Sequence, residues 1–557
     1  MKKTLLIILI GILVAPFFQG CDDFLDEENI RIPIADTYFT TEAGIEDATR
    51  ACYPFLRRYY GREEGFTVTT FGTDIYLHGS DGGRKDFNFY GSGIQPSESF
   101  LSTIWNNFYL GIAACNTVIS RAPEAEMDET LKTTRMGEAY FLRAVYYHIL
   151  VMQWGPVPLE LEETTEVVTT ATRTPESQVY TQIIDDLKKA ESMLPAEQDD
   201  YGRPTSWAAK AMLARMYLTT KNYAEASNYA KSVINSGVFS LVTDYANLWD
   251  INNQKNEEII WSVQYTADER LNVVNDPYQS DGIDDGGHRA HLYFLMEYDV
   301  QKNMKRDVAN GRPWKRYLPS RHFLDMLQAD RDVDARFDKA WKFVWYANNE
   351  STLLPGVNIG DTGVYVVPYA VSDDVKAMYN EKIAFFDIND YFDPDSPDGE
   401  IPLGKRNRFP SLNKFIDPLR PTVQHEPGQR DWNVLRLAEM YLIAAEAAVM
   451  ENNNQEAADM INVIRTRAAW QGKEADMQVT ADMMDLDYIL DERARELCGE
   501  MFRWPDLKRT GKLIERVKLY NPDGRDNIKE FHLLRPIPTT MIDRVSNKDE
   551  FLQNPGY

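Results

Sequence analysis

Two irregular stretches of the sequence combine aromatic side chains with charged and amide side chains. The first is glycine-rich and covers about residues 62–98, and the second lies around residues 278–317. Aromatic faces pack against the apolar faces of sugar rings, while carboxylate, amide and guanidinium groups bind sugar hydroxyls. The two stretches therefore predict a carbohydrate-binding site. Its candidate ligand contacts are Asp74, Tyr76, Arg84, Tyr90, Trp105, Tyr293, Trp314 and Tyr317.

Trp314, Tyr76 and Arg84 are the first candidates among these residues. The alternative role for each is a place in the core or on a surface that does not bind ligand. Aromatic side chains such as Trp314 and Tyr76 also fill protein interiors. Trp105 opens a helical pattern, so packing is the favoured role for its indole ring. Tyr278 adds a further aromatic side chain to the second stretch.

Catalytic motifs are absent from the sequence: it contains no HExxH, GxSxG, P-loop or Cys/His arrangement. The most regular row of carboxylates, Glu492, Glu496 and Glu500, has helical i, i+4 spacing. Arg493 and Arg495 lie beside this row, and we expect the helix to pair its charges with Arg503 and Arg509. A catalytic role is disfavoured, because catalytic carboxylates need a cleft and a raised pKa. The sequence therefore favours a binding protein over an enzyme.

An acidic loop is the remaining candidate for a metal site. It contains Asp393, Asp395, Asp398 and Glu400, but the segment lacks the ligand register of a calcium EF-hand loop. A solvated loop is the expected role. The sequence leaves a structural calcium ion open and indicates no cofactor.

The composition narrows the choice of partners. The chain has 557 residues and a formal net charge of −26, which argues against nucleic acid and against electrostatic attachment to anionic lipid. Beyond Cys21, the three cysteines Cys52, Cys115 and Cys498 do not form a disulfide framework. We expect them to be small buried hydrophobic residues, although one disulfide among them stays open.

The N-terminus predicts export and a lipid anchor. Lys2 and Lys3 precede an apolar run that is shorter than the roughly 18 residues of a membrane span, as in a secretory signal. The Gly20–Cys21 pair that follows resembles the lipobox of bacterial lipoproteins, in which the cysteine is acylated. We therefore predict a signal peptide over 1–20 and a lipidated acidic tether over 21–40. An ordinary signal peptide is the alternative.

Helical periodicity dominates the two ends of the chain. Leu213, Tyr217 and Ala226 have the spacing of a tetratricopeptide helix pair, and small residues recur at helical spacing over 432–450. Between 241 and 430 the periodicity fails, and Asp, Gly and Pro predict loops with short strands. The predicted parts are a helical part over 41–240, an irregular ligand-binding insertion over 241–430, and a C-terminal helical repeat with a docked tail over 431–557.

Ordered motifs along the whole chain resemble the SusD/RagB family of outer-membrane lipoproteins of the Bacteroidetes. Trp105, Tyr109, Ile112 and Asn116 fit a W-x3-Y-x2-I-x3-N helix of that family. The other matching segments are 138–144, 154–159, 202–205, 436–447, 461–468, 492–497, 503–509, 534–538 and 553–557.

The resemblance implies a mostly α fold, in which four tetratricopeptide-like helix pairs carry the irregular insertion. It implies a cell-surface lipoprotein on the outer face of the outer membrane, beside a SusC-like TonB-dependent transporter. Such a protein captures oligosaccharides or, in the RagB branch, peptides, and it is a binding protein without catalytic activity. The acidic residues after Cys21 resemble the surface-export signal of these lipoproteins. No fixed motif marks the ligand contacts, so none transfers residue by residue.

Overall fold

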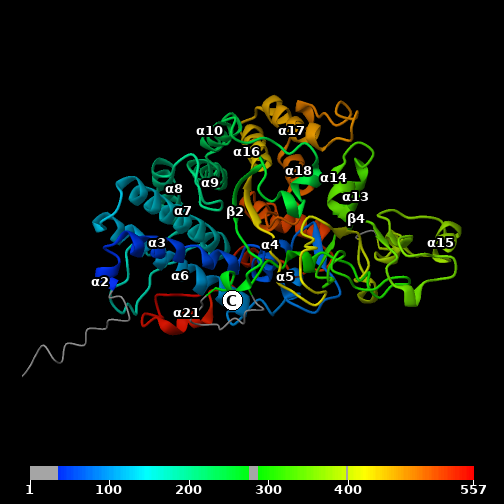
Figure 1. The fold of residues 1–557 in the computed structure, drawn as a ribbon, viewed down its shortest axis with the longest axis horizontal. Coiled ribbons are helices and arrows are strands. Elements are labelled where there is room, and N and C mark those ends of the chain that lie inside the picture. The colour runs from blue at the N-terminus through cyan, green and yellow to red at the C-terminus, as the bar shows by residue number, and fades with distance from the viewer. Residues whose placement is uncertain (1–34, 275–285, 397–398) are drawn as a thin grey trace, which may run out of the picture.

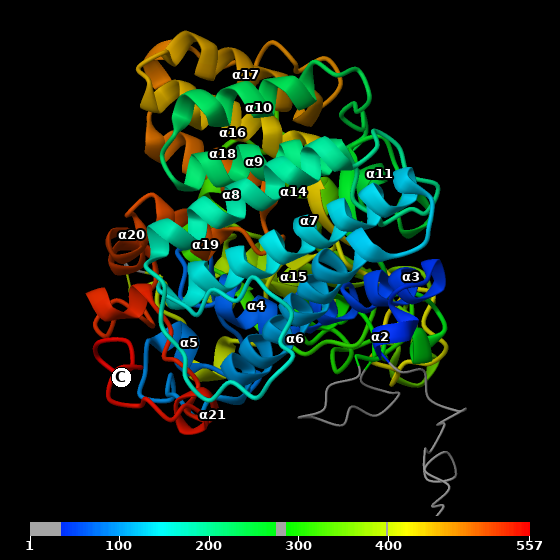
Figure 2. The same cartoon turned by 90° about the vertical axis from the view of Figure 1, so that its left-hand side faces the viewer.

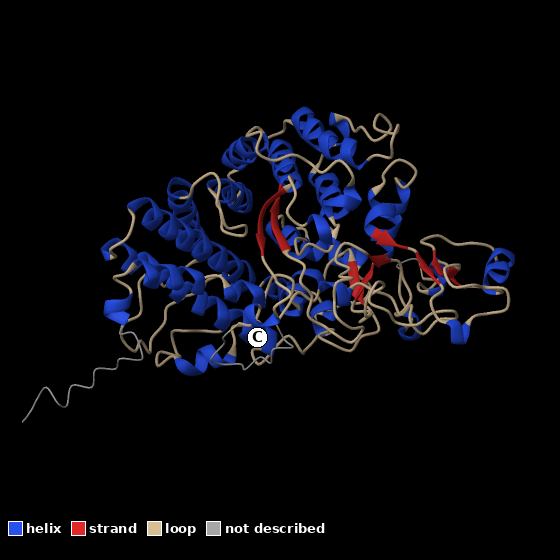
Figure 3. Ribbon diagram, in the orientation of Figure 1, coloured by secondary structure: helices blue, strands red, loops and turns tan. Residues whose placement is uncertain are grey.

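The computed structural model describes residues 35–274, 286–396 and 399–557. The predicted signal peptide, Cys21 and most of the acidic tether lie outside the described residues, as do Tyr278 and Asp398. Helices dominate and the strands are short, which confirms the mostly α fold (Figure 3). None of the helices in the described part of the chain combines the length and hydrophobicity that a membrane span needs.

Eight helices pack in a row, each against the next, and form the four predicted helix pairs (Figures 1 and 2). The row continues from α10 to α16, although the whole insertion separates these helices in the sequence. The eight helices are α3 (Glu42–Ala51), α6 (Ser99–Arg121), α7 (Glu129–Trp154), α8 (Glu176–Met193), α9 (Ser206–Thr219), α10 (Tyr223–Ile234), α16 (Leu437–Met450) and α17 (Asn454–Ala468).

Local signals explain where these helices begin and how closely they pack. The Asp128 carboxylate accepts the first free N–H groups of α7, and Thr205 caps α9 in the same way. Asn452 takes a left-handed backbone conformation (φ 62°) in the turn between α16 and α17. Gly111 lets α6 approach α7, because a Cβ there would lie 2.5 Å from the Tyr146 ring. The three cysteines beyond Cys21 are buried free thiols.

Two strands, one near the start of the insertion and one directly after its end, pair with each other. β2 (Ile259–Val263) pairs antiparallel with β9 (Trp432–Arg436), with Val263 opposite Trp432. The prediction of a helix from residue 432 is therefore wrong for its first turn. Apolar side chains in this segment pair with β2, and α16 begins only at Leu437, where the small residues start.

The remaining strands are short and lie mainly within the insertion. β5 (Val344–Tyr346) and β6 (Thr362–Val366) are antiparallel, and β7 (Ala384–Phe386) adds to β6 in parallel. The other strands are β1 (Tyr76–His78), β3 (Tyr317–Pro319), β4 (Trp341–Lys342) and β8 (Ser411–Leu412).

Shorter helices connect these parts. Those before the insertion are α2 (Ala35–Tyr38), α4 (Glu63–Thr70) and α5 (Asp86–Phe89). Those of the insertion are α11 (Tyr245–Leu248), α12 (Ala290–Tyr293), α13 (Arg321–Ala329), α14 (Arg336–Ala340) and α15 (Asp373–Asn380). The C-terminal ones are α18 (Leu486–Leu497), α19 (Arg503–Arg509), α20 (Leu513–Tyr520) and α21 (Thr539–Arg544).

Candidate functional site

The two stretches that the sequence predicts as ligand-binding meet in space. β1 pairs antiparallel with β3, so that His78 lies opposite Tyr317. The Gly79 N–H extends this ladder by donating to the Arg316 carbonyl at 2.8 Å. The N-terminal loop and the insertion are thus joined by a buried ladder.

Three of the predicted aromatic contacts, Tyr76, Tyr293 and Tyr317, pack in one aromatic cluster at this ladder. The Tyr293 and Tyr317 rings are 5.9 Å apart, and both contact Phe66. Such aromatic contacts stabilise a core. Tyr76, Tyr90, Trp105, Tyr293 and Tyr317 are all at most 3% exposed. Because a ligand cannot reach buried rings in this conformation, we do not carry these residues into the proposed site.

Trp105 and Tyr90 each have a packing partner that explains their position. The Trp105 indole packs edge-to-face on Trp154, with ring centroids 5.2 Å apart, and it also borders a groove of about 380 Å³ beside α6. The Tyr90 hydroxyl donates to the Gly72 carbonyl at 2.6 Å. Both contacts support the packing role that the sequence left open.

Asp74 is a buried ion-pair partner. Its carboxylate lies 2.6 Å from guanidinium nitrogens of both Arg503 and Arg516. Burial alone would raise the pKa of Asp74, but the two arginines hold it well below its usual range. The structure thus gives this carboxylate a role in joining the N-terminal loop to the C-terminal helices.

Arg84 and Trp314 are the two predicted contacts that remain accessible. Arg84 keeps 35% of its side chain exposed, stacks its guanidinium 4.2 Å above the Phe100 ring and donates to Ser99. Trp314 is partly buried, with the Tyr293 ring 5.7 Å away and the Arg316 guanidinium 5.5 Å away.

Lys315 and Arg316 follow Trp314 in the chain, and both bind further polar groups. Glu297 accepts from Lys315 at 2.8 Å and from Asn407 at 2.7 Å, and Arg316 pairs with Asp81 at 2.9 Å. A half-buried aromatic ring bordered by carboxylate, amide and cationic groups matches the composition of a sugar site. We refer to Trp314 and these five neighbours as the Trp314 surface.

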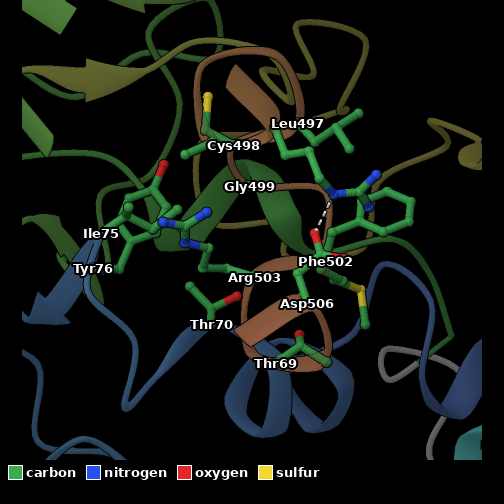
Figure 4. Close-up of a pocket in the computed structure, with 13 residues that line it drawn as sticks. Thr69, Thr70, Ile75, Tyr76, Leu497, Cys498, Gly499, Phe502, Arg503 and Asp506 are labelled. Carbon is green, nitrogen blue, oxygen red and sulfur yellow. Dashed lines mark hydrogen bonds and ion pairs between the residues drawn. The ribbon is translucent and has the colours of Figure 1, made fainter. Parts of the chain in front are cut away.

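A cavity beside Tyr76 is too small for a ligand (Figure 4). It measures about 10 Å³, room for roughly one water molecule. Arg493, which also lines it, donates to Asp506 at 2.7 Å. The first candidate among the tyrosines therefore borders a packing void, not a binding pocket.

The predicted row of carboxylates forms a buried ion-pair lattice with partners that the sequence did not indicate. Glu496 pairs with Arg336, Arg436 and Arg467 at 2.5–3.0 Å. Of the two arginines predicted to pair with this helix, Arg503 lies 4.0 Å from Asp491 of α18, whereas Arg509 pairs with residues outside the helix. Arg503 pairs with Asp74, and Arg509 with Glu446 and Asp506.

The electrostatics of this lattice oppose acid catalysis. Burial would raise the pKa of Glu492, but Arg336, Arg465 and Arg495 lower it to about 2. A general acid needs a shift in the opposite direction.

The acidic loop is only partly described. Glu400 pairs with Arg525 at 2.9 Å, and the Asp393 carboxylate accepts the Asp395 N–H at 3.0 Å. Asp398 lies outside the described residues. Within the described residues, no three His, Cys, Asp or Glu side chains are grouped closely enough to hold a metal ion.

One cavity contains residues that the sequence analysis did not select. It measures about 470 Å³ and is lined by Tyr53, Arg57 and Tyr201, among others. The only sequence signal was the position of Tyr201 directly before the 202–205 motif. This motif predicted a helix start and not a site.

A row of paired helices that carries an irregular insertion with surface aromatic residues defines a helical-repeat binding scaffold. A family model described as "SusD family" matches residues 257–557 of this scaffold. A second, described as "Starch-binding associating with outer membrane", matches residues 23–218. The chain belongs to the SusD family, as the sequence resemblance predicted.

Individual relatives agree with this assignment. The chain is 24% identical to a SusD-like protein P25 of Formosa agariphila, covering 97% of this chain and 96% of that one. It is 24% identical to the starch-binding protein SusD of Bacteroides thetaiotaomicron, covering 83% and 80%. The structure of a laminarin-binding SusD-like protein shares the fold, with a TM-score of 0.68, 23% identity, and coverage of 93% and 100%. The latter two proteins are named for the glycans that they bind, starch and laminarin.

Proposed function

We propose that this protein is a cell-surface lipoprotein that captures oligosaccharides and delivers them to a SusC-like TonB-dependent transporter of the outer membrane. The observation that carries the proposal is the Trp314 surface. It combines an accessible indole with carboxylate, amide and cationic groups where two distant segments meet. The starch-binding and laminarin-binding names among the matched proteins support a glycan ligand. Capture of peptides by the same surface is the alternative.

Replacing Trp314 with alanine is expected to weaken glycan binding about tenfold, because the ring face is lost from the site. Isothermal titration of the wild-type chain and Trp314→Ala with starch and laminarin oligosaccharides would measure this change. The melting temperature should stay nearly unchanged. Trp105→Ala is the contrasting variant, because removing this buried indole should cost about 3–5 kcal/mol of stability.

Unchanged affinity together with a large loss of stability would place Trp314 in the core and contradict the proposed surface. Incubation with the same oligosaccharides, followed by chromatography, separates a binding protein from an enzyme. We expect intact ligand, and cleaved products would contradict the proposal. Binding of peptides without binding of any oligosaccharide would favour the alternative ligand.

Anchoring is tested at Cys21. The Cys21→Ser variant should move from the membrane fraction to the soluble fraction, because the proposed acyl chain supplies the membrane affinity of an acidic protein. Fractionation with an antibody against the chain measures the distribution. A mutation at Cys52 is the control, since this thiol is buried and should not affect the fraction in which the protein is found. Copurification of the wild-type chain with a large β-barrel protein tests the transporter partner.

A further inference from the structure

A second cavity lies away from the Trp314 surface and shares no residue with it. It separates the 3-10 helix Pro54–Arg58 from the turn before α9 and from β2, and its volume is about 470 Å³. This volume falls in the range of roughly 300–1,000 Å³ that small-ligand sites occupy. We refer to it as the Tyr201 groove, with Tyr53, Arg57, Asp199, Tyr201 and Gln264 as its defining residues.

Arg57 is the unusual charge in this groove. Its guanidinium donates to the carbonyls of Gln264 at 2.9 Å and Leu271 at 2.7 Å, so its position is fixed by backbone groups. Within the described residues it forms no ion pair with a carboxylate. The other two arginines of the groove differ: Arg203 pairs with Glu138 at 2.7 Å, and Arg50 pairs with acidic residues of its own helix.

The surroundings of Arg57 leave its charge incompletely balanced. Burial lowers the pKa of Arg57, so its charged form would gain from an anionic partner. Asp431 acts on Arg57 electrostatically, but it forms no ion pair with it and accepts the Tyr265 N–H at 2.8 Å instead. A positioned cation without a partner carboxylate is notable in a chain whose net charge is −26.

The tyrosines of the groove offer ring surface, because their hydroxyls are already engaged. The Tyr53 hydroxyl donates to Glu138, and the Tyr201 hydroxyl donates to the Gln254 carbonyl at 3.2 Å. Tyr201 is partly exposed, and the Lys255 ammonium lies 5.1 Å from its ring. The Asp199 carboxylate and the Gln264 side-chain amide make no hydrogen bond within the described residues, so both remain available for hydroxyl groups.

From this geometry we propose that the Tyr201 groove binds a uronic acid unit of an acidic oligosaccharide. The carboxylate of the sugar pairs with Arg57, its ring packs on Tyr201, and its hydroxyls bind Asp199 and Gln264. A guanidinium matches a carboxylate in charge and geometry. The choice of a sugar as ligand rests on the proposed function, and the groove extends that function to charged glycans. A peptide carboxylate would also pair with Arg57, but a peptide has no ring hydroxyls to bind Asp199 and Gln264.

The test uses the full mature chain and matched ligands. Trigalacturonate and trimannuronate are titrated beside their methyl esters, which keep the rings and hydroxyls but lose the charge. At least one of the acids should bind about tenfold more tightly than its ester, and Arg57→Gln should abolish this difference. Tyr201→Ala should weaken both forms, whereas Tyr201→Phe, which keeps the ring, should bind like the wild-type chain.

Two controls separate the possible outcomes. Arg57→Gln could unfold, because Arg57 also binds the Leu271 carbonyl. In that case two other measurements still test the inference: the comparison of Tyr201→Ala with Tyr201→Phe, and the ratio of acid to ester affinity in the wild-type chain. Trp314→Ala should keep the preference for acid over ester, even if it weakens the binding of both forms, because that preference depends on Arg57. Equal binding of acid and ester, no binding of either acid, or loss of the preference in Trp314→Ala would overturn the inference.

Further outcomes distinguish this inference from the proposed function. A chain that binds neutral glycans through Trp314 but neither acid disproves only the Tyr201 groove. A chain that binds no oligosaccharide of either kind disproves the proposed function as well. Tighter binding of a tripeptide with a free carboxylate than of either acid would overturn the sugar assignment and give the groove to peptides.

Discussion

Replacing Glu496 with alanine is expected to lower the free energy of unfolding by about 3–5 kcal/mol, because the buried arginines around it lose their shared counter-charge. The Glu496 side chain is fully buried and pairs with Arg336, Arg436 and Arg467. These arginines come from α14, from the end of β9 and from α17. The lattice therefore connects the insertion with the C-terminal helices, and its loss affects both.

Urea unfolding followed by circular dichroism would measure the loss in Glu496→Ala. Asp47→Ala is the matched control: Asp47 also pairs with an arginine, at 3.2 Å, but the pair is exposed and should contribute at most about 1 kcal/mol. A loss in Glu496→Ala no larger than in the control would contradict the role of the lattice.

The same ion-pair lattice predicts that the protein becomes less stable at acidic pH. The folded pKa of Glu492 is about 2, below its ordinary value of 4.5. A carboxyl group with a depressed folded pKa stabilises the protein above its unfolded pKa, and this stabilisation is lost as the pH falls through the folded value. The unfolding free energy should therefore decrease between about pH 4.5 and 2, and this decrease should be smaller in Glu496→Ala.

The helical scaffold could be predicted from the sequence because its signals are local. Small residues at helical spacing over 437–450 define α16, and the asparagines after it define the turn. Residues 432–436 were assigned to this helix incorrectly, because their strand depends on β2, which lies far away in the sequence. A strand whose pairing partner is distant in the chain has no local sequence pattern that reveals the pairing.

The site could be predicted only in part, for a related reason. Tyr76 and Trp314 are both aromatic residues in irregular, polar segments of the sequence. In the structure Tyr76 is only 1% exposed, whereas Trp314 stays accessible. The pairing of β1 with β3 decides between them, and it joins segments that are distant in the chain. Likewise, Arg57 is recognised only in three dimensions, because within the described residues it lines a cavity, binds two backbone carbonyls and forms no ion pair.

Replacing Asp74 with alanine is expected to cost about 3–5 kcal/mol, because Arg503 and Arg516 would lose the fully buried carboxylate that they share and keep only the more exposed Asp487 and Asp491. The sequence assigned Asp74 to a ligand, and the structure assigns it to the junction between the loop before β1 and the helices α19 and α20. Thermal unfolding therefore distinguishes the two roles.

Asp81→Asn is the control for Asp74→Ala. Asp81 belongs to the same N-terminal stretch and pairs with Arg316 on the Trp314 surface, but its side chain keeps 22% of its area exposed. We expect Asp74→Ala to unfold at a much lower temperature, while Asp81→Asn mainly changes glycan affinity. A stable Asp74→Ala protein that no longer binds glycan would return Asp74 to the ligand site. That result would require the loop before β1 to open, because a fully buried carboxylate cannot reach a sugar in the conformation described.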